Sequence, residues 1–183
     1  MKKNYLLLVL AFVSTFALCQ ENVVTLSGGY SFANIEDTDA NANGFRINGL
    51  YEFNPMGGKF AHGLSIGYIG TKANTTLVSQ PVDYKINNWP VYYAPKFMFG
   101  GEDAKGFVKG ALGWQWSNIK RTGIGNETSF NDSGIYVGAS VGGMKSLSEK
   151  VFFNLEYEWA YMSNSFYRDG FMNTIMAGFG MKF

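Results

Sequence analysis

After residue 19 the sequence contains no long apolar run, and apolar residues recur instead at every second position. In the segment 151–162, Val151 and Phe153 begin an apolar series on odd positions, whereas Asn154 and Glu156 occupy even ones. Alternate side chains of a strand point to opposite faces, so the pattern predicts a strand with one apolar and one mixed face. A membrane-spanning helix needs about 20 successive apolar residues, which excludes one in this part of the chain.

The same alternation predicts eight strands. Aromatic residues make up 17% of the chain and glycine occurs 23 times, which favours strands over helices. The predicted strands cover residues 23–33, 44–53, 59–70, 84–99, 106–118, 133–145, 151–162 and 171–183.

The fourth predicted strand is irregular. Its apolar residues lie at even positions before Asn87 and at odd positions after Asn88, and it contains Pro90 and Pro95. Proline removes a hydrogen-bond donor from a sheet, and one extra residue in a strand reverses its parity. We therefore expect a β-bulge near Asn88.

The predicted connections alternate in length. Short turns fall at 54–58, 100–105 and 146–150, and longer polar loops fall at 34–43, 71–83, 119–132 and 163–170. Eight strands with both chain ends on the short-turn side are typical of an eight-stranded antiparallel up-and-down transmembrane β-barrel, which is all-β. We expect one such domain over residues 20–183.

Residues 1–19 have the pattern of a cleaved signal peptide. Two lysines follow the first methionine, and an apolar core covers residues 5–18. Ala17 and Cys19 are the small residues that precede a cut, which would leave Gln20 as the mature N-terminus. The alternative is a lipoprotein cut before Cys19, which the bulky Leu18 disfavours. The predicted cut removes the chain's one cysteine and with it any disulfide.

Both a membrane barrel and a soluble lipocalin-like barrel can be built from eight such strands. The mixed face is rich in Gly, Ala, Ser and Thr, which suit the narrow interior of an eight-stranded barrel rather than a wetted surface. The large aromatics also fall in two bands, as expected for girdles at the two membrane interfaces. The outer band is Tyr30, Tyr68, Trp89, Trp114, Trp116, Trp159 and Tyr161, and the inner band is Phe53, Phe60, Phe99, Phe153 and Phe183.

The mature chain as a whole resembles the small outer-membrane barrels of the OmpA/OmpX type. Its last strand ends on Phe179, Met181 and Phe183, which resembles the C-terminal signal read by the outer-membrane assembly machinery. The resemblance implies a bacterial outer-membrane location after export, contact with outer-membrane lipids and lipopolysaccharide, and a monomer without a cofactor.

Five charged residues point inward by parity: Arg46, Lys96, Lys109, Glu156 and Glu158. An isolated buried charge is strongly unfavourable, so these residues must pair. We expect a lumenal network in which the two glutamates are held by the three cations. The network can act as a plug that fills the core or as an ion path, and the narrow interior favours the plug.

Candidate chemistry is sparse. The formal net charge of +1 gives no field for holding nucleic acid. A serine hydrolase would need His62, the only histidine, but Ser65 has the opposite parity and residue 64, where lipid A deacylases have serine, is Leu64. The segment starting at Asp39 matches the first half of a calcium loop, but its twelfth position is Leu50, so we expect no metal site.

The outer loops carry the remaining candidates, Lys120, Arg121, Phe166, Tyr167 and Arg168, whose aromatics we expect to be exposed and to anchor the loops among lipid head groups. The sequence therefore favours a non-enzymatic surface barrel with a filled lumen, whose loops serve envelope integrity, surface contact or adhesion. A narrow porin-like channel is the alternative, and a lipid A-modifying enzyme is a third hypothesis.

Overall fold

The computed structural model describes residues 21–35, 40–54, 58–77, 80–123, 127–163 and 166–183. The predicted signal segment 1–19 lies outside them. One short 3₁₀ turn, η1 (Arg168–Gly170), precedes the last strand. The strands are β1 (Glu21–Asn34), β2 (Asn41–Asn54), β3 (Phe60–Leu77), β4 (Gln80–Tyr93), β5 (Lys96–Gly100), β6 (Ala104–Thr122), β7 (Thr128–Ser146), β8 (Val151–Met162) and β9 (Phe171–Lys182). In the described part of the chain no helix is long and apolar enough to cross a membrane.

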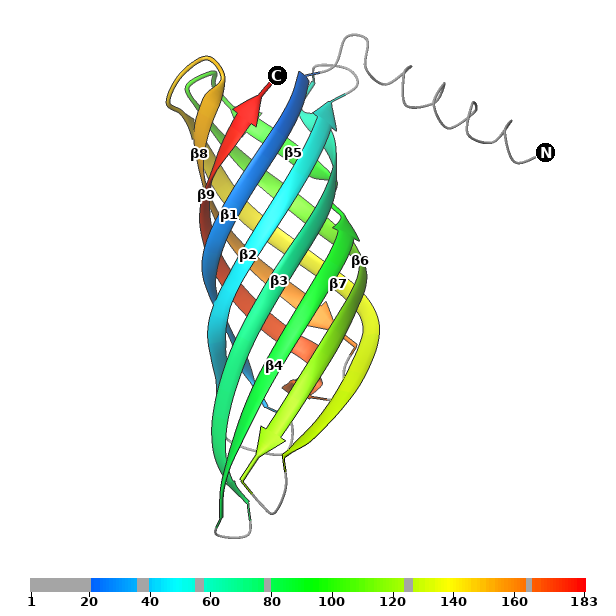
Figure 1. The fold of residues 1–183 in the computed structure, drawn as a ribbon. Helices are drawn as coiled ribbons and strands as arrows, with labels where there is room; N and C mark the ends of the chain where they lie inside the picture. The colour runs from blue at the N-terminus through cyan, green and yellow to red at the C-terminus, as the bar shows by residue number, and fades with distance from the viewer. Residues whose placement is uncertain (1–20, 36–39, 55–57, 78–79, 124–126, 164–165) are drawn as a thin grey trace, which may run out of the picture.

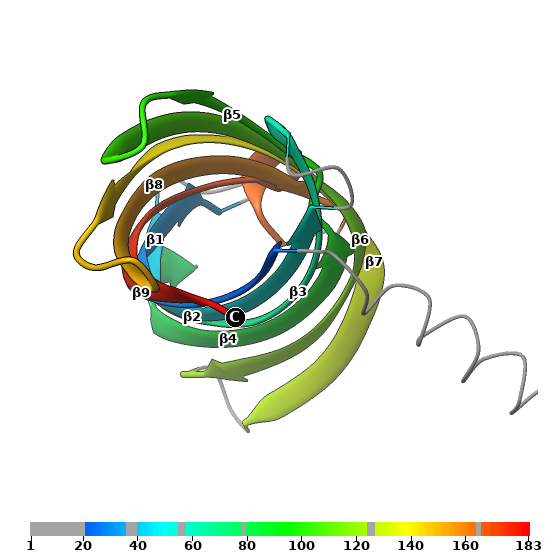
Figure 2. The same cartoon turned by 90° about the horizontal axis from the view of Figure 1, so that it is seen from above.

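The strands form one closed antiparallel ring, as Figures 1 and 2 show. Apart from β4 and β5, which do not pair with each other, each strand pairs with its neighbours in the chain. Strand β1 closes the ring by pairing with β9 from Val23↔Lys182 to Phe32↔Asn173. Strands β4 and β5 occupy one position in the ring, because both lie between β3 and β6. The ring therefore has eight positions, and the predicted eight-stranded barrel is confirmed.

The predicted bulge near Asn88 is wrong. Tyr93 faces Leu64 and Lys96 faces Ala61, so the register of β3 is unchanged across the whole segment. The strand is interrupted instead at Ala94 and Pro95, where Ala94 still donates its N–H to the Gly63 carbonyl at 2.8 Å. Even-numbered residues point inward on both sides of Asn88.

Near Asn88 the apolar residues move from the inward face of the strand to its outward face, while the direction of each side chain still follows the parity of its position. Val82 and Ile86 are fully buried inside the ring, whereas Asp83 and Lys85 between them are exposed. The outward side chains toward the β3–β4 tip are thus polar, and the inward ones form the barrel's own apolar core. This is the pattern of a soluble sheet, as expected where strands extend beyond lipid into water.

Two of the four predicted long loops are largely strand. Strands β3 and β4 pair as far as Leu77↔Gln80, and β6 and β7 pair as far as Arg121↔Thr128. The polar segments 71–83 and 119–132 were expected as loops because their outward residues are hydrophilic. They form two hairpins that extend farthest from the end where the chain terminates (Figure 1).

The closing seam between β1 and β9 needs a residue without a side chain at Gly178. A Cβ atom built there would lie 2.3 Å from the Leu26 carbonyl oxygen and 2.7 Å from the Ser27 Cα atom. The neighbouring Ala177 points outward and is exposed. Gly178 therefore lets the backbones of the two terminal strands approach each other.

We predict that Gly178→Val lowers the free energy of unfolding by about 2–3 kcal/mol, since a side chain forced into a packed site costs this much. The measurement is urea-dependent unfolding of the protein in lipid vesicles. Ala177→Val adds the same type of side chain on the outward face and should change stability by less than about 1 kcal/mol. Equal stability of the two variants would contradict the role of Gly178.

Candidate functional site

Arg46, inward from β2, lies at the centre of the polar lumen. Its Nη1 atom is 2.5 Å from Glu158 Oε1 and donates to the Tyr136 hydroxyl at 3.0 Å. Its Nη2 atom donates to the Tyr92 hydroxyl at 2.9 Å. Tyr136 also donates to Glu158, and the rings of Tyr92 and Tyr136 stack 5.0 Å apart beside the guanidinium group. Four side chains from four strands thus meet across the lumen.

Lys109 from β6 links the second glutamate to this cluster. Its Nζ atom lies 2.5 Å from Glu156 and 4.0 Å from Glu158. Glu156 and Glu158 are neighbours on the inward face of β8, so Lys109 lies between two carboxylates. The predicted links from Arg46 and Lys109 to these glutamates are therefore present as ion pairs.

Lys96 has a different partner from the one expected. Its Nζ atom contacts both carboxylate oxygens of Glu52, at 2.7 and 2.8 Å, and lies 4.7 Å from the centre of the Phe107 ring. Glu52 shares the inward face of β2 with Arg46, and its even position could have placed it in the network. Tyr92 and Tyr136 were also missed, although their even positions in the predicted strands point inward.

The buried charges balance. Three cations and three carboxylates form ion pairs, and each of the six side chains is at most 6% exposed. Burying a single unpaired charge is strongly unfavourable, whereas hydrogen-bonded pairs across several strands tolerate burial. This charge layer fills the lumen with fixed side chains. The described residues that form it are Arg46, Glu52, Tyr92, Lys96, Lys109, Tyr136, Glu156 and Glu158.

An apolar layer lies next to the charge layer, toward the projecting hairpins. Ile69, Ile86 and Ile119 from three adjacent strands have no exposed surface. Phe166 and Tyr167, from the β8–β9 connection, join this layer at 7% and 1% exposure. The expectation that these two aromatics are exposed anchors is wrong, because the connection folds back into the barrel.

Tyr167 holds the β8–β9 connection in place by polar contacts. Its hydroxyl accepts a hydrogen bond from Asn88 at 3.0 Å and lies 2.9 Å from the Thr71 hydroxyl. Its backbone forms a bridge with Ile35 from the β1–β2 connection. Burial raises the pKa of Tyr167 to about 12, so the hydroxyl stays protonated at neutral pH. The β1–β2 and β8–β9 connections therefore both cover the apolar layer.

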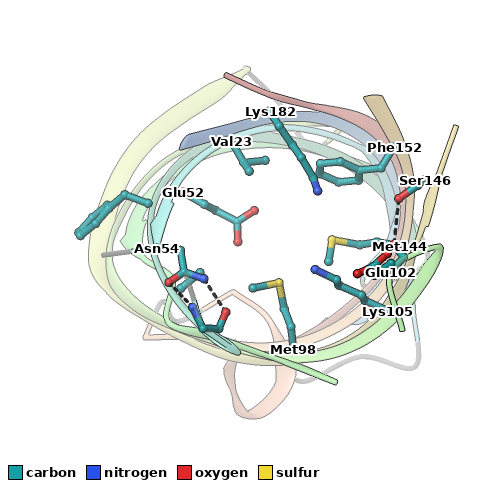
Figure 3. Close-up of a pocket in the computed structure, with 13 residues that line it drawn as sticks. Val23, Glu52, Asn54, Met98, Glu102, Lys105, Met144, Ser146, Phe152 and Lys182 are labelled. Carbon is teal, nitrogen blue, oxygen red and sulfur yellow. Dashed lines mark hydrogen bonds between the residues drawn. The ribbon is translucent and has the colours of Figure 1, made fainter. Parts of the chain in front are cut away.

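The opposite end of the lumen contains a cavity of about 80 Å³. Figure 3 shows Glu52, Met98, Met144 and Lys105 directed into it from different strands. Phe152 and Lys182 line another side. Residues of the short turns, Gly58, Glu102 and Ser146, line this cavity, and so does Glu52, the partner of Lys96.

The predicted girdle aromatics all point away from the lumen. Nine of the twelve are exposed, and Phe53, Tyr68 and Phe153 are half-buried. Phe179 and Met181 of the predicted assembly signal also point outward, at 59% and 52% exposure, and the terminal Phe183 is 60% exposed. Large exposed apolar side chains around a polar interior invert the arrangement of a soluble protein.

The structure does not bring His62 and Ser65 together. His62 points outward, with Nδ1 2.5 Å from the Tyr93 hydroxyl and its ring between Phe53 and Phe60. Ser65 points inward and donates to the Asn48 side chain and to the Gly49 carbonyl, each at 3.0 Å. The two residues lie on opposite faces of β3, as their parity predicted.

The calcium-like segment is mostly strand. Asp39 lies outside the described residues, whereas Asn41 and Asn43 belong to β2 and pair with Asn34 and Phe32. Within the described ranges, no group of three His, Cys, Asp or Glu side chains could hold a metal ion.

A closed ring of antiparallel strands with an apolar exterior and a charged, filled lumen defines a transmembrane β-barrel. The model of the outer membrane protein beta-barrel domain matches residues 5–183. The chain belongs to this family. No curated protein gives a significant match to the sequence.

Solved structures share the fold. Neisserial surface protein A (NspA) is 13% identical with a TM-score of 0.63, and the match covers 88% of this chain and 97% of that one. Ail, the attachment invasion locus protein of Yersinia pestis, is 21% identical with a TM-score of 0.55, covering 89% and 99%. A major outer membrane protein from Thermus thermophilus is 8% identical with a TM-score of 0.65, covering 88% and 99%.

We predict that Glu158→Gln lowers the free energy of unfolding by about 3–5 kcal/mol, because it leaves Arg46 charged and without its carboxylate partner. Urea-dependent unfolding in vesicles gives the value. Glu127→Gln is the matched control, since Glu127 forms an exposed pair with Lys120 at 3.6 Å and its loss should cost less than about 1 kcal/mol. A Glu158→Gln variant as stable as the control would show that the charge layer does not stabilise the barrel.

Proposed function

We propose that this chain is a closed, non-enzymatic barrel of the bacterial outer membrane whose function lies on its outer surface. The observation that carries the proposal is the two-layered filling of the lumen. Paired charges occupy one layer, and Ile69, Ile86 and Ile119 with the buried Phe166 and Tyr167 occupy the next. An eight-stranded ring has room only for side chains, and here they fill it.

The outward side chains support a membrane position. Apolar residues cover the outside of the ring, and the aromatics predicted as girdles lie on this face. We propose that they contact lipid at the two interfaces, with the short turns and both chain ends toward the periplasm. Phe179, Met181 and Phe183 are the residues we propose the assembly machinery reads. Residues 1–19 we propose as a cleaved export signal, and the barrel as a monomer.

The projecting hairpins are the part of the outer surface that we propose binds a partner, without catalysis. The β3–β4 and β6–β7 hairpins continue the barrel wall beyond the other strands as paired sheet, which gives a firmer platform than loops do (Figure 1). A solved structure of Ail with the same fold is in complex with the heparin analogue sucrose octasulfate, at 23% identity and a TM-score of 0.55. These features support a role in surface contact or adhesion.

A narrow channel is the second candidate, favoured by the cavity at the short-turn end. We expect the purified protein to give no steady current in planar bilayers, because the apolar layer leaves ions no hydrated path. The measurement is single-channel conductance of the wild type beside Glu156→Gln. Steady currents that change size or ion selectivity in Glu156→Gln would contradict the closed barrel and support the channel.

The surface role predicts that the projecting hairpins can be removed without loss of the barrel. Replacing residues 74–83 by Asn-Gly leaves the pair Ala73↔Tyr84 next to a two-residue turn. In a deletion strain, we expect the wild type and this variant to restore resistance to detergent equally, and only the wild type to restore surface adhesion. Adhesion by the shortened variant at the wild-type level would contradict a role for the β3–β4 hairpin.

A further inference from the structure

Three lysines lie side by side on the outside of the barrel. Lys72 of β3 is directly opposite Lys85 of β4, which is directly opposite Lys120 of β6. All three side chains are exposed. Like charges directly opposite each other destabilise a strand pair, and this row contains two such pairs in succession. An anion bound across the row would remove the repulsion.

Acidic neighbours compensate the lysine row only in part. Within the described residues the row makes a single salt bridge, the exposed contact of Lys120 with Glu127 at 3.6 Å. Asp83 lies in the next row toward the hairpin tip, opposite Thr122. The middle of the row, at Lys85, is therefore flanked on both sides by another lysine rather than by a carboxylate.

A row of amides lies immediately below the lysines. Asn87 is opposite Asn118, which is opposite Asn131. Asn118 donates to Asn131 Oδ1 at 2.8 Å and to Ser129 Oγ at 3.2 Å. Three amides and a hydroxyl thus form a band of hydrogen-bonding groups on the same outer face.

Two tryptophans lie below the amides. Trp89 and Trp116 are directly opposite each other and each is 51% exposed. A surface hollow there is lined by both tryptophans together with Ser117, Asn118, Asn131, Asp132 and Ser133. Flat aromatic faces beside amides suit the apolar face and the hydroxyl groups of a sugar ring.

The spacing of the rows fits the outer interface of a bilayer. Lys85 is four residues from Trp89, and Lys120 is four residues from Trp116, which is about 13 Å along a strand. With the usual tilt of barrel strands this corresponds to about 10 Å of height. If the tryptophans lie at the edge of the hydrocarbon, the lysines lie at the height of charged head groups.

We propose that this face of β3, β4, β6 and β7 binds a phosphorylated glycolipid of the outer leaflet, with the chemistry of lipid A. Its acyl chains lie along the apolar wall below Trp89 and Trp116, its sugar lies against the tryptophans and the amides, and its phosphate lies on the lysines. The amide row decides between lipids, because a glycerophospholipid has no sugar between its acyl chains and its phosphate. The inference rests on the proposed orientation of the barrel.

The test uses the full barrel in detergent, with bisphosphorylated lipid A, dephosphorylated lipid A and phosphatidylglycerol as probes and native mass spectrometry as the measure of binding. We expect the triple variant K72Q/K85Q/K120Q to bind lipid A at least about tenfold more weakly than the wild type. Binding of the dephosphorylated probe should be equal for both. The matched control is K59Q/K145Q/K150Q, which removes three exposed lysines near the short turns and should bind lipid A like the wild type.

A second variant tests the sugar contact. W89L/W116L keeps an apolar surface but removes the aromatic faces, and we expect it to weaken lipid A binding while binding of phosphatidylglycerol stays unchanged. Folding of every variant is checked by the faster migration of the unheated barrel in SDS gels. K72Q/K85Q/K120Q removes three exposed charges and one exposed ion pair, Lys120–Glu127, which contributes little to stability, so we expect the variant to fold like the wild type.

Four outcomes would overturn the proposal. The first is that K72Q/K85Q/K120Q binds lipid A as tightly as the wild type does, and the second is that the control variant loses as much binding as this variant. The third is that the wild type binds phosphatidylglycerol as tightly as lipid A. The fourth is that inorganic phosphate or a heparin oligosaccharide at equal concentration displaces lipid A. If only the lipid A site is wrong, the barrel still gives no current in planar bilayers. If the proposed closed barrel is wrong, the wild type gives a steady current, so the two failures are distinguishable.

Discussion

The pairing of β1 with β9 is the contact on which the rest of the structure depends. In lipid, an unpaired backbone N–H or C=O group cannot find water, so a sheet must close on itself to remove both of its edges. Residues 23–32 of β1 meet residues 173–182 of β9 in a continuous register. Gly178 lies within this seam, where a side chain would meet the Leu26 carbonyl.

Closure with eight strand positions makes the interior narrow, and the narrow interior decides the chemistry of the lumen. Side chains must fill it, and charged ones must be paired there because little solvent can reach them. The Arg46–Glu158 pair with Tyr92 and Tyr136 satisfies both requirements at one level of the barrel. The same requirement accounts for Lys96, which pairs with Glu52, a residue that lines the cavity at the short-turn end.

The strands have apolar outward side chains along one part of their length and polar outward side chains along the other, so the barrel has two parts with different surfaces. Where the outside is apolar, the inside carries the charge layer. Toward the β3–β4 and β6–β7 tips, the outside carries Lys72, Lys85 and Lys120 and the inside carries Ile86 and Ile119. The packed interior and the polar outer wall are the two features on which the proposed surface function rests.

The alternation in the sequence was enough to predict the ring of eight strands, because the direction of a side chain in a strand follows from the parity of its position. Parity also placed Arg46, Lys109, Glu156 and Glu158 inside and His62 outside. It could have placed Glu52, Tyr92 and Tyr136 inside as well. Parity does not say which inward residues meet. Lys96 of β5 reaches Glu52 of β2 past the intervening strand β3, although the two residues are 44 positions apart in the chain.

How far the strands continue and where the connections fold depends on contacts between segments that are distant in the chain. A polar segment such as 71–83 has the composition of a loop, yet it pairs as strand because its inward residues join the apolar layer. Phe166 and Tyr167 are buried because the barrel end offers them a place in that layer, which no local pattern records. The alternation of residues was enough to assign the two faces of each strand, because these depend on local geometry. The partners of the inward residues and the layer in which each one lies depend on the closed ring.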